Sequence, residues 1–296
     1  MRNDFKRLRP GDKDIVTEYL RAAANISCEY SFANLCAWAD VEAITWSESS
    51  GVLLIRNRDG HFFPIAACGD RGKAEAAAAA LAAGGASFVH LNKEQADFLT
   101  GSFPGMFEVS CDRDRSEYIH DAESFRTYAG KKLHAKRNHM NRFEAMYGDI
   151  CSVERIGPGN LAECAEYSRA WGEVNRYYLN GTLAADLKLV DFFLSHYQEL
   201  GLFGICLRLS GAVRGFTVAE RAYPGSSAAV VHVEKASYEI DGIYPALASM
   251  LMREFPEYAA VNREDDLGDE GLRKSKLSYR PLYLLEKYTA RNVGGK

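Results

Sequence analysis

Hydrophobic residues in the first half of the chain follow the spacings of short strands and helices. Strand-like runs are separated by turn signals such as Asp59-Gly60, and helical runs carry apolar residues three or four positions apart, as in Phe32 and Leu35. This pattern predicts strands over 5–8, 43–47, 52–57, 62–67, 87–91 and 106–110, and helices over 10–24, 31–40, 74–83 and 93–100.

The second half shows the same kind of patterning after Gly148. Ser210-Gly211 marks a turn between two strands, and Pro256 ends a helix. We predict strands over 150–156, 203–209, 213–221, 228–235, 258–262 and 282–288, and helices over 160–178, 185–200, 243–255 and 271–279.

The order of elements is the same in both halves, although no residue-level repeat is visible. The GNAT acyltransferase fold has this order of elements: a strand, two helices, a three-stranded meander, a helix and a strand. We therefore expect an α+β protein with tandem GNAT-like domains, each a mixed sheet flanked by helices. Residues 1–120 would form the first domain, and 121–296 a basic bridging helix plus the second.

The bridging segment is positively charged, in contrast to the whole chain. Residues 124–143 contain six Lys or Arg, two His and no carboxylate, whereas the whole chain has a net charge of −4. On a helix of about 100° per residue, Leu133, Met140 and Phe143 form an apolar stripe. The candidate substrate-binding residues from this helix are Lys131, Lys132, Lys136, Arg137, Asn138 and Arg142, of which Lys136 falls inside the apolar stripe.

Two interpretations of this helix compete. It could be a solvated amphipathic helix in which Lys136 extends its ammonium group to water. It could instead be an anion-binding face for the phosphates of a nucleotide, a transfer RNA or a lipid head group. The uniform sign favours the second, because helices built for solvation usually gain from opposite charges four residues apart.

Composition is that of an ordinary globular protein, with 47% hydrophobic and 26% charged residues. Because the whole chain has a net charge of −4, a polyanionic partner would have to bind a local positively charged patch. Seven scattered cysteines without a CxxC pair indicate reduced thiols and no zinc site. The N-terminus has no apolar signal-peptide core, and the apolar run 74–83 is too short to cross a bilayer. We expect a cytoplasmic protein with no transmembrane segment.

Three motifs carry a resemblance to a known family. GKKLHAKRNHMNRFEAMYG (130–148) resembles the basic helix of the phosphatidylglycerol lysyltransferase C-terminal-domain family. VNREDDLGDEGLRKSKLSYRP (261–281) resembles its late signature, and SFANLCAW (31–38) is similar to the early motif of its stand-alone members. The wider kinship is with the Fem-type peptidyltransferases.

The resemblance implies that the protein takes an aminoacyl group from aminoacyl-tRNA and passes it to an acceptor. The chain lacks the multi-helix membrane portion of the lipid-modifying members, and it has Lys274-Ser275 where they tend to have an aromatic residue before the lysine. The acceptor is therefore left open among a lipid head group, a peptide and a small molecule.

Lys276 is a candidate catalytic residue. On the helix predicted over 271–279, Leu272, Lys276 and Tyr279 share a face, so Lys276 points toward the core. Acyl transfer from an ester needs a fixed positive group where the carbonyl oxygen becomes an oxyanion. A structural ion pair is the alternative. Arg273 and Arg280 suit phosphate contacts, or are simply solvated charges.

Two further candidates lie on the strand predicted over 228–235. Strand alternation would put His232 and Glu234 on one face and Val231 and Val233 on the other. Either polar residue could deprotonate an attacking amine or hydroxyl group. The alternative is a half-exposed strand with its polar side chains turned to water.

The resemblance also suggests that Asn262, Arg263 and Asp265 hold the amino group of the aminoacyl moiety. The acidic run 264–270 lacks the spacing of an EF-hand and is explained by helix capping. No metal and no cofactor are therefore expected. Arg176-Tyr177-Tyr178 could stack an adenine of a CCA end or belong to the core.

Two other functions are open. A CoA-dependent GNAT N-acetyltransferase would need a glycine-rich turn that cradles pyrophosphate at a helix N-terminus. The matching segment, 237–246, has one glycine and two acids, which is a poor cradle. The other alternative is a non-catalytic protein that binds RNA or a nucleotide through the basic helix.

Overall fold

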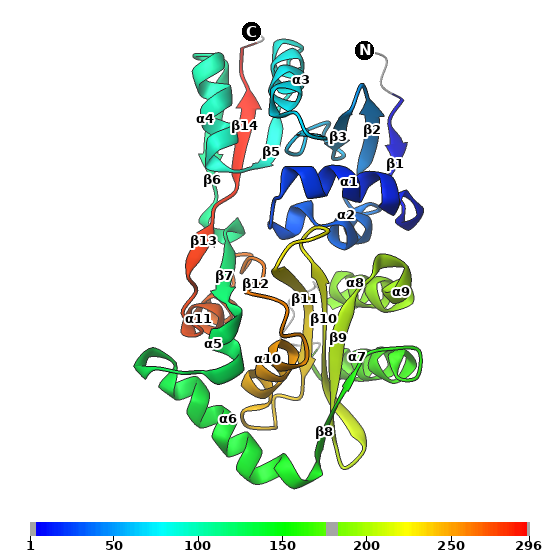
Figure 1. Ribbon diagram of the computed structural model, residues 1–296, viewed down its shortest axis with the longest axis vertical. Coiled ribbons are helices and arrows are strands. Elements are labelled where there is room, and N and C mark those ends of the chain that lie inside the picture. Colours follow the sequence, from blue (N-terminus) through cyan, green and yellow to red (C-terminus); the bar gives the residue numbers. More distant parts are fainter. Residues whose placement is uncertain (1–3, 176–182, 295–296) are drawn as a thin grey trace.

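The computed structural model of the protein describes residues 4–175 and 183–294. Its two halves are stacked along the long axis, with the N-terminal half at the top of Figure 1 and the C-terminal half below. Both chain ends that the view marks lie at the top, because the last strand returns to the N-terminal half.

The N-terminal half holds two small sheets with strand orders β1-β2-β3-β4 and β5-β14-β6. Isolated bridges from Arg56 to Phe62 and from Phe62 to Phe88 connect them, whereas β4 and β5 do not pair. The strands are β1 (Lys6–Arg7), β2 (Thr45–Ser49), β3 (Val52–Arg56), β4 (Ala66–Ala67), β5 (Phe88–Leu91), β6 (Phe107–Cys111) and β14 (Tyr288–Asn292), and the helices are α1 (Lys13–Ala23), α2 (Phe32–Trp38), α3 (Arg71–Ala83) and α4 (Lys93–Ser102).

The C-terminal half is organised around a seven-stranded sheet with the order β13-β7-β12-β11-β10-β9-β8. Neighbouring strands are antiparallel except β11 and β12, which are parallel. The strands are β7 (Glu117–Asp121), β8 (Cys151–Arg155), β9 (Phe203–Leu209), β10 (Ala212–Arg221), β11 (Ala228–Ala236), β12 (Ala260–Asn262) and β13 (Tyr283–Leu285). The helices are α5 (Ala122–Thr127), α6 (His134–Tyr147), α7 (Leu161–Asn175), α8 (Leu183–Ser195), α9 (Tyr197–Leu200), α10 (Ile243–Glu254) and α11 (Glu270–Ser278).

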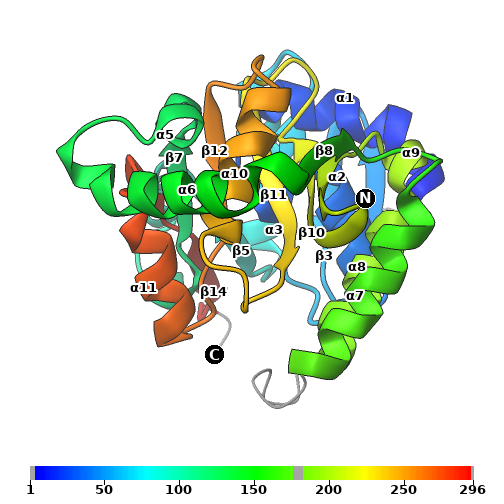
Figure 2. The same ribbon diagram turned by 90° about the horizontal axis from the view of Figure 1, so that it is seen from below.

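Alternating apolar residues cover both faces of this sheet. Ile205 and Leu207 on β9 join the core under α5, α6 and α10, whereas Cys206 faces the core shared with α8 and the N-terminal helices. Helices therefore lie on both sides of the sheet, as Figure 2 shows from below. This explains why β9 to β11 are almost continuously buried.

Two strands differ from the sequence-based prediction. β7 was not predicted, and it joins the C-terminal sheet between β12 and β13. The single strand predicted over 282–288 is wrong: the chain leaves the C-terminal sheet after Leu285 and pairs again from Tyr288, as β14, in the N-terminal half. The division at 120/121 stays a prediction, and these two strands show that the chain exchanges segments across it.

The basic segment is not one continuous helix. Tyr128 and Gly130 have left-handed φ values of 46° and 84°, which separate α5 from a 3-10 turn (Lys131–Leu133) and α6. The predicted apolar stripe is confirmed, because Leu133, Met140 and Phe143 are buried in the core beneath α10.

Candidate functional site

The C-terminal sheet opens between its two parallel strands. β11 and β12 pair only at Ala228–Ala260, Ala229–Val261 and Val230–Asn262, and beyond these positions their backbones no longer hydrogen-bond to each other. Side chains from β11 and from the segment after β12 span the opening instead. They make two ion pairs, one toward each face of the sheet.

The first ion pair involves His232, which lies at a β-bulge. Val218 pairs with Val233 and Ala219 with Val231, so His232 is the extra residue of β11. The bulge turns His232 toward Phe193 of α8, with ring centroids 4.9 Å apart. The predicted common face for His232 and Glu234 is therefore wrong, because a bulge shifts the alternation by one residue.

Both ring nitrogens of His232 are occupied. Nε2 lies 2.9 Å from Glu220 Oε1, and Nδ1 lies 2.7 Å from Glu264 Oε1. Burial lowers the pKa of His232, but the hydrogen bonds to the two carboxylates outweigh burial and raise that pKa to about 9. An imidazolium with two carboxylate partners suits a structural tie better than a general base.

The second ion pair joins Glu234 to Arg263, with Nη2 2.7 Å from Oε2. The other atoms of the pair, Arg263 Nη1 and Glu234 Oε1, are buried and make no hydrogen bond to any described residue. One donor and one acceptor of this ion pair are therefore left without a described partner. Both atoms are enclosed, so a ligand with an oxygen acceptor and a polar hydrogen could pair with them only where the opening admits it.

Lys136 and Arg263 approach the same aromatic ring. Lys136 Nζ lies 3.8 Å and the Arg263 guanidinium 4.6 Å from the centroid of Tyr279. Burial and the nearby Arg263 lower the pKa of Lys136 to about 8. The two cations share one carboxylate, Glu234, so this side of the opening carries surplus positive charge.

Lys276 lies on the buried side of α11, as its spacing predicted, with 8% of its surface exposed. Its Nζ donates to the backbone carbonyl of Asp265, and no carboxylate lies within ion-pair distance in the described part of the chain. Burial lowers the pKa of Lys276. The alternative of a structural ion pair therefore lacks support.

Asn262 and Asp265 are engaged inside the protein. Asn262 donates to the carbonyl of Ile26 at 2.8 Å and to Glu117. Asp265 Oδ2 lies 3.2 Å from Lys287 Nζ, and burial raises the pKa of Asp265 to about 6 although Lys287 lowers it. Of the three residues expected to hold an amino group, Arg263 keeps an N–H without a described acceptor, and this donor suits an oxygen acceptor rather than an ammonium group.

Arg273 holds α11 in place. It makes two contacts with Asp266, at 3.0 and 2.7 Å, and one with Asp114 at 2.5 Å. Burial would raise the pKa of Asp266, but hydrogen bonds from Arg273 and Tyr118 hold it well below its usual range. Arg273 is thus partly occupied by this network.

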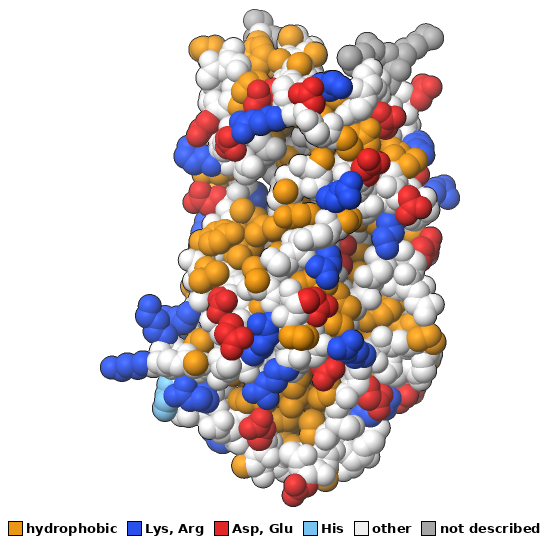
Figure 3. Space-filling model, viewed as in Figure 1, with side chains coloured by type: hydrophobic (Ala, Val, Ile, Leu, Met, Phe, Trp, Pro, Cys, Tyr) orange, Lys and Arg blue, Asp and Glu red, His pale blue; other side chains and the backbone are white. Residues whose placement is uncertain are grey.

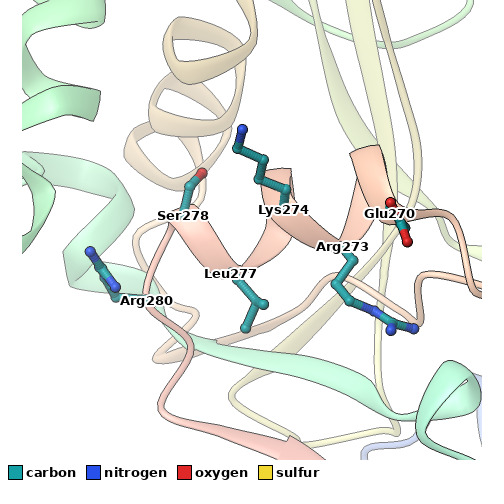
Figure 4. Close-up of a pocket in the computed structure, with 6 residues that line it drawn as sticks. All are labelled: Glu270, Arg273, Lys274, Leu277, Ser278 and Arg280. Atoms are coloured by element: carbon teal, nitrogen blue, oxygen red, sulfur yellow. The ribbon is translucent and has the colours of Figure 1, made fainter.

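The outer face of α11 borders an open, shallow pocket (Figure 4). Lys274 and Leu277 project from the helix, and Arg280 follows on the segment after it. Arg280 is exposed and has a left-handed φ of 56°. The pocket therefore offers cationic groups on the outside of the helix whose inner face carries Lys276.

Basic side chains gather where α6 begins, at the lower left edge in Figure 3. Lys131 and Lys132 are exposed, and no hydrogen bond or ion pair links them to a described residue. Asn138 is also exposed and contacts His134 at 3.4 Å. Arg137 instead donates to the carbonyls of Tyr128 and Gly130, at 2.8 and 3.3 Å, and so stabilises the turn before α6.

The N-terminus of α10, where a GNAT enzyme would bind pyrophosphate, is covered by α6. A side chain at Gly242 would collide with the backbone carbonyl of His139. Asp241 lies 3.0 Å from His139 and 3.3 Å from Arg142, and Pro245 in the first turn has no N–H group. This end of α10 therefore presents a carboxylate and few free donors to a pyrophosphate.

A buried charged network behind the opening was not anticipated from sequence. Lys287 Nζ lies 3.1 Å from both Glu29 and Glu117, and Glu117 also accepts from Ser27 Oγ (2.6 Å) and the Cys28 N–H (2.9 Å). These residues come from distant parts of the chain and connect the two halves. Its members lie far apart in the sequence, so no local pattern indicated it.

Two sequence-based expectations concern chain segments rather than site geometry. Arg176, Tyr177 and Tyr178, proposed for base stacking, lie outside the described residues. Among the helices that the structure describes, none is both long and apolar enough to span a membrane.

Known proteins resemble this chain in fold. A conserved protein of unknown function from Bacteroides thetaiotaomicron VPI-5482 is 29% identical, with a TM-score of 0.90 over 98% of this chain and 99% of that one. The C-terminal domain of a putative lysylphosphatidylglycerol synthetase from Agrobacterium fabrum is 15% identical, with a TM-score of 0.60 over 93% and 92%. A tandem GNAT protein from the clavulanic acid biosynthesis pathway is 13% identical, with a TM-score of 0.50 over 99% of each chain. The predicted α+β, tandem GNAT-like fold is confirmed.

Sequence comparison identifies the family. An uncharacterized protein of Mycoplasmoides gallisepticum is 23% identical over 179 residues, which are 60% of this chain and 56% of that protein. The chain therefore spans just over half the length of this curated relative. The family described as "Phosphatidylglycerol lysyltransferase, C-terminal" matches residues 21–291. The protein belongs to the phosphatidylglycerol lysyltransferase C-terminal-domain family.

Proposed function

We propose that the protein is an aminoacyltransferase that moves an aminoacyl group from aminoacyl-tRNA to an acceptor carrying an amine or a hydroxyl group. The observation that carries the proposal is the opening between β11 and β12, which has surplus positive charge on its α6 side. Membership of the family supports acyl transfer as the reaction class. The covered N-terminus of α10 weighs against CoA as the donor.

In the proposed reaction, the acceptor nitrogen or oxygen adds to the ester carbonyl of the donor. The carbonyl oxygen becomes an oxyanion that Lys276 stabilises, with Arg263 Nη1 as a second donor. Glu234 Oε1 accepts the proton that the nucleophile loses. The bond from the carbonyl carbon to the terminal ribose oxygen then breaks, and that oxygen leaves with the proton.

The basic residues at the start of α6 would hold the donor. Lys131 and Lys132 are exposed and are our proposed phosphate contacts, together with Arg142, Asn138 and Arg280. Lys136, which lies over Tyr279 next to the opening, would approach the terminal phosphate or ester. The acceptor stays open among a lipid head group, a peptide and a small molecule, and we propose that the protein acts in the cytoplasm.

The direct test is a transfer assay with labelled aminoacyl-tRNA and a panel of the three acceptor classes, combined with filter binding at several salt concentrations. The variant Lys131→Glu/Lys132→Glu should weaken retention of charged tRNA. The slope of log K against log salt concentration should also become shallower, by the amount that about two lost phosphate contacts produce. The matched control, Lys73→Glu/Lys188→Glu, reverses two exposed lysines elsewhere and should retain tRNA more strongly than the test variant.

Three outcomes separate the alternatives. Retention unchanged in Lys131→Glu/Lys132→Glu would reject the basic turn before α6 as the tRNA contact. Stabilisation by acetyl-CoA without any effect of tRNA would support a CoA-dependent N-acetyltransferase. Salt-dependent tRNA binding without turnover on any acceptor would support a non-catalytic RNA-binding protein.

A further inference from the structure

An exposed aromatic side chain lies just beyond the C-terminal end of β11. Tyr238, in the connection between β11 and α10, is 68% exposed, against 49% for Tyr283 at the sheet edge. Most of its ring therefore takes no part in packing. Single exposed apolar residues are common on protein surfaces, so exposure alone does not make Tyr238 a binding residue.

The ring of Tyr238 is held from behind by other aromatic residues. Its centroid lies 5.2 Å from Tyr244 and 6.0 Å from Trp171, at interplanar angles of 36° and 39°. Both supporting residues are anchored at the end of β11: Trp171 Nε1 and Tyr244 OH donate to the carbonyl of Ala236 at 2.8 and 3.0 Å. Tyr238 is thus an oriented platform rather than a free side chain.

The platform adjoins the basic helix. Three residues after Tyr238, Asp241 pairs with Arg142 and His139 of α6. Figure 2 shows the β11–α10 connection passing beneath α6, between α11 and α7. Asp241 occupies Arg142 and the connection also carries Glu239, so the cations without described partners are Lys131 and Lys132, just before α6. Cations and an exposed aromatic ring on one surface are the combination with which proteins bind single-stranded nucleic acids.

We propose that Tyr238 stacks on a base of the unpaired 3′ end of the RNA donor while α6 contacts the phosphates. This inference rests on the proposed function, since it assigns the RNA end to the mouth of the same opening. Stacking engages the face of any base, so it would position the RNA end without reading its sequence. The terminal ester would then lie toward Arg263 and Lys276.

Titration of the full chain with the RNA trinucleotide CCA tests the proposal, with an abasic sugar–phosphate trinucleotide of equal charge as the reference probe. Tyr238→Ala should weaken CCA binding about five- to a hundredfold and leave abasic binding unchanged. Tyr238→Phe and Tyr238→Trp should bind CCA like the wild type, because stacking needs the ring and not the hydroxyl group. Tyr283→Ala removes another exposed tyrosine and should have no effect.

Equal CCA affinity in wild type and Tyr238→Ala would overturn the proposal, as would equal affinity of the wild type for CCA and the abasic probe. The two proposals fail separately. CCA binding that depends on Tyr238 without any transfer would retain the platform and reject the transferase. Transfer that depends on Lys276 but is indifferent to Tyr238→Ala would retain the transferase and reject the platform.

Discussion

At the residue scale, the main feature of this site is a pair of lysines that are wholly or partly buried and have no carboxylate partner of their own. Lys276 has a single backbone carbonyl as its described hydrogen-bond acceptor, and Lys136 lies against the ring of Tyr279. Burial of an unpaired ammonium group costs free energy, as the lowered pKa of each lysine reflects. A protein that retains two such groups beside one opening is suited to developing or bound negative charge.

Replacement of Lys276 tests its proposed role. Lys276→Met should lower turnover by about 10²–10³, because an oxyanion donor is lost while a side chain of similar length still fills the space. The melting temperature should stay at or above that of the wild type, since an unpaired buried charge is removed. Lys274→Met, on the outer face of the same helix, is the control. A loss of turnover matched by loss of folding would instead indicate a structural lysine.

The His232 tie predicts a pH dependence of stability. Its folded pKa of about 9 lies above the ordinary value of 6.5, so it stabilises the fold fully below pH 6.5 and loses this contribution as the pH rises to about 9. The free energy of unfolding should therefore fall by on the order of 2–3 kcal/mol across that interval. Urea titrations of wild type and His232→Gln check this, and an equally steep fall in the variant would contradict it.

At this scale, the sequence predicted correctly what depends on the periodicity of a single helix. The spacing of Lys276 and Tyr279 correctly predicted that Lys276 faces the core, whereas Leu272, predicted on the same face, is 41% exposed. It failed at His232, because a bulge depends on how β10 and β11 pair and leaves no mark in the alternation itself. The partners of Glu234 and Asp265 come from other elements, so their contacts could not be predicted.

At the element scale, α6 combines two functions on two faces. Its apolar stripe packs under α10, and its cations lie along the outside and at the edge of the opening. The turn at Tyr128 and Gly130 was missed because Tyr128 is a non-glycine residue with a positive φ, which sequence patterns rarely reveal.

Removal of the apolar anchor of α6 should cost stability. Phe143 is fully buried between α6 and α10, and Phe143→Ala should destabilise the protein by about 3–5 kcal/mol because it leaves a cavity. Chemical denaturation measures this. Glu144→Ala changes the exposed neighbour on the same helix and should stay within about 0.5 kcal/mol of the wild type. Equal effects of the two substitutions would mean that α6 is not anchored in this way.

At the scale of the whole molecule, a buried network ties the two halves together. Glu117 on β7 accepts hydrogen bonds from Ser27 and Cys28 of the N-terminal half and forms an ion pair with Lys287 on the returning chain. Glu117→Ala would leave the positive charge of Lys287 and the donor groups of Ser27 and Cys28 without their carboxylate partner. It should therefore destabilise the protein by about 3–5 kcal/mol.

A single cooperative unfolding transition should persist if the halves are coupled. Two separate transitions in the wild type would contradict that coupling.

The repeated order of elements predicted the tandem architecture, because each half keeps its own local periodicities. The exchanged strands could not be predicted in the same way. β7 carries Glu117 and His120 within five residues, which resembles an exposed segment, yet both are buried by partners from remote parts of the chain. Long-range pairing of this kind is a property of the whole molecule.

The position of β14 has a consequence for biosynthesis. This strand is the centre of the β5-β14-β6 sheet, although it is made from residues close to the C-terminus. During translation, β5 and β6 emerge well before β14, and the edges that β14 pairs with stay open while the residues between Cys111 and Tyr288 are synthesised. The β5-β14-β6 sheet therefore cannot close before β14 has emerged, and until then those unpaired edges are exposed to aggregation.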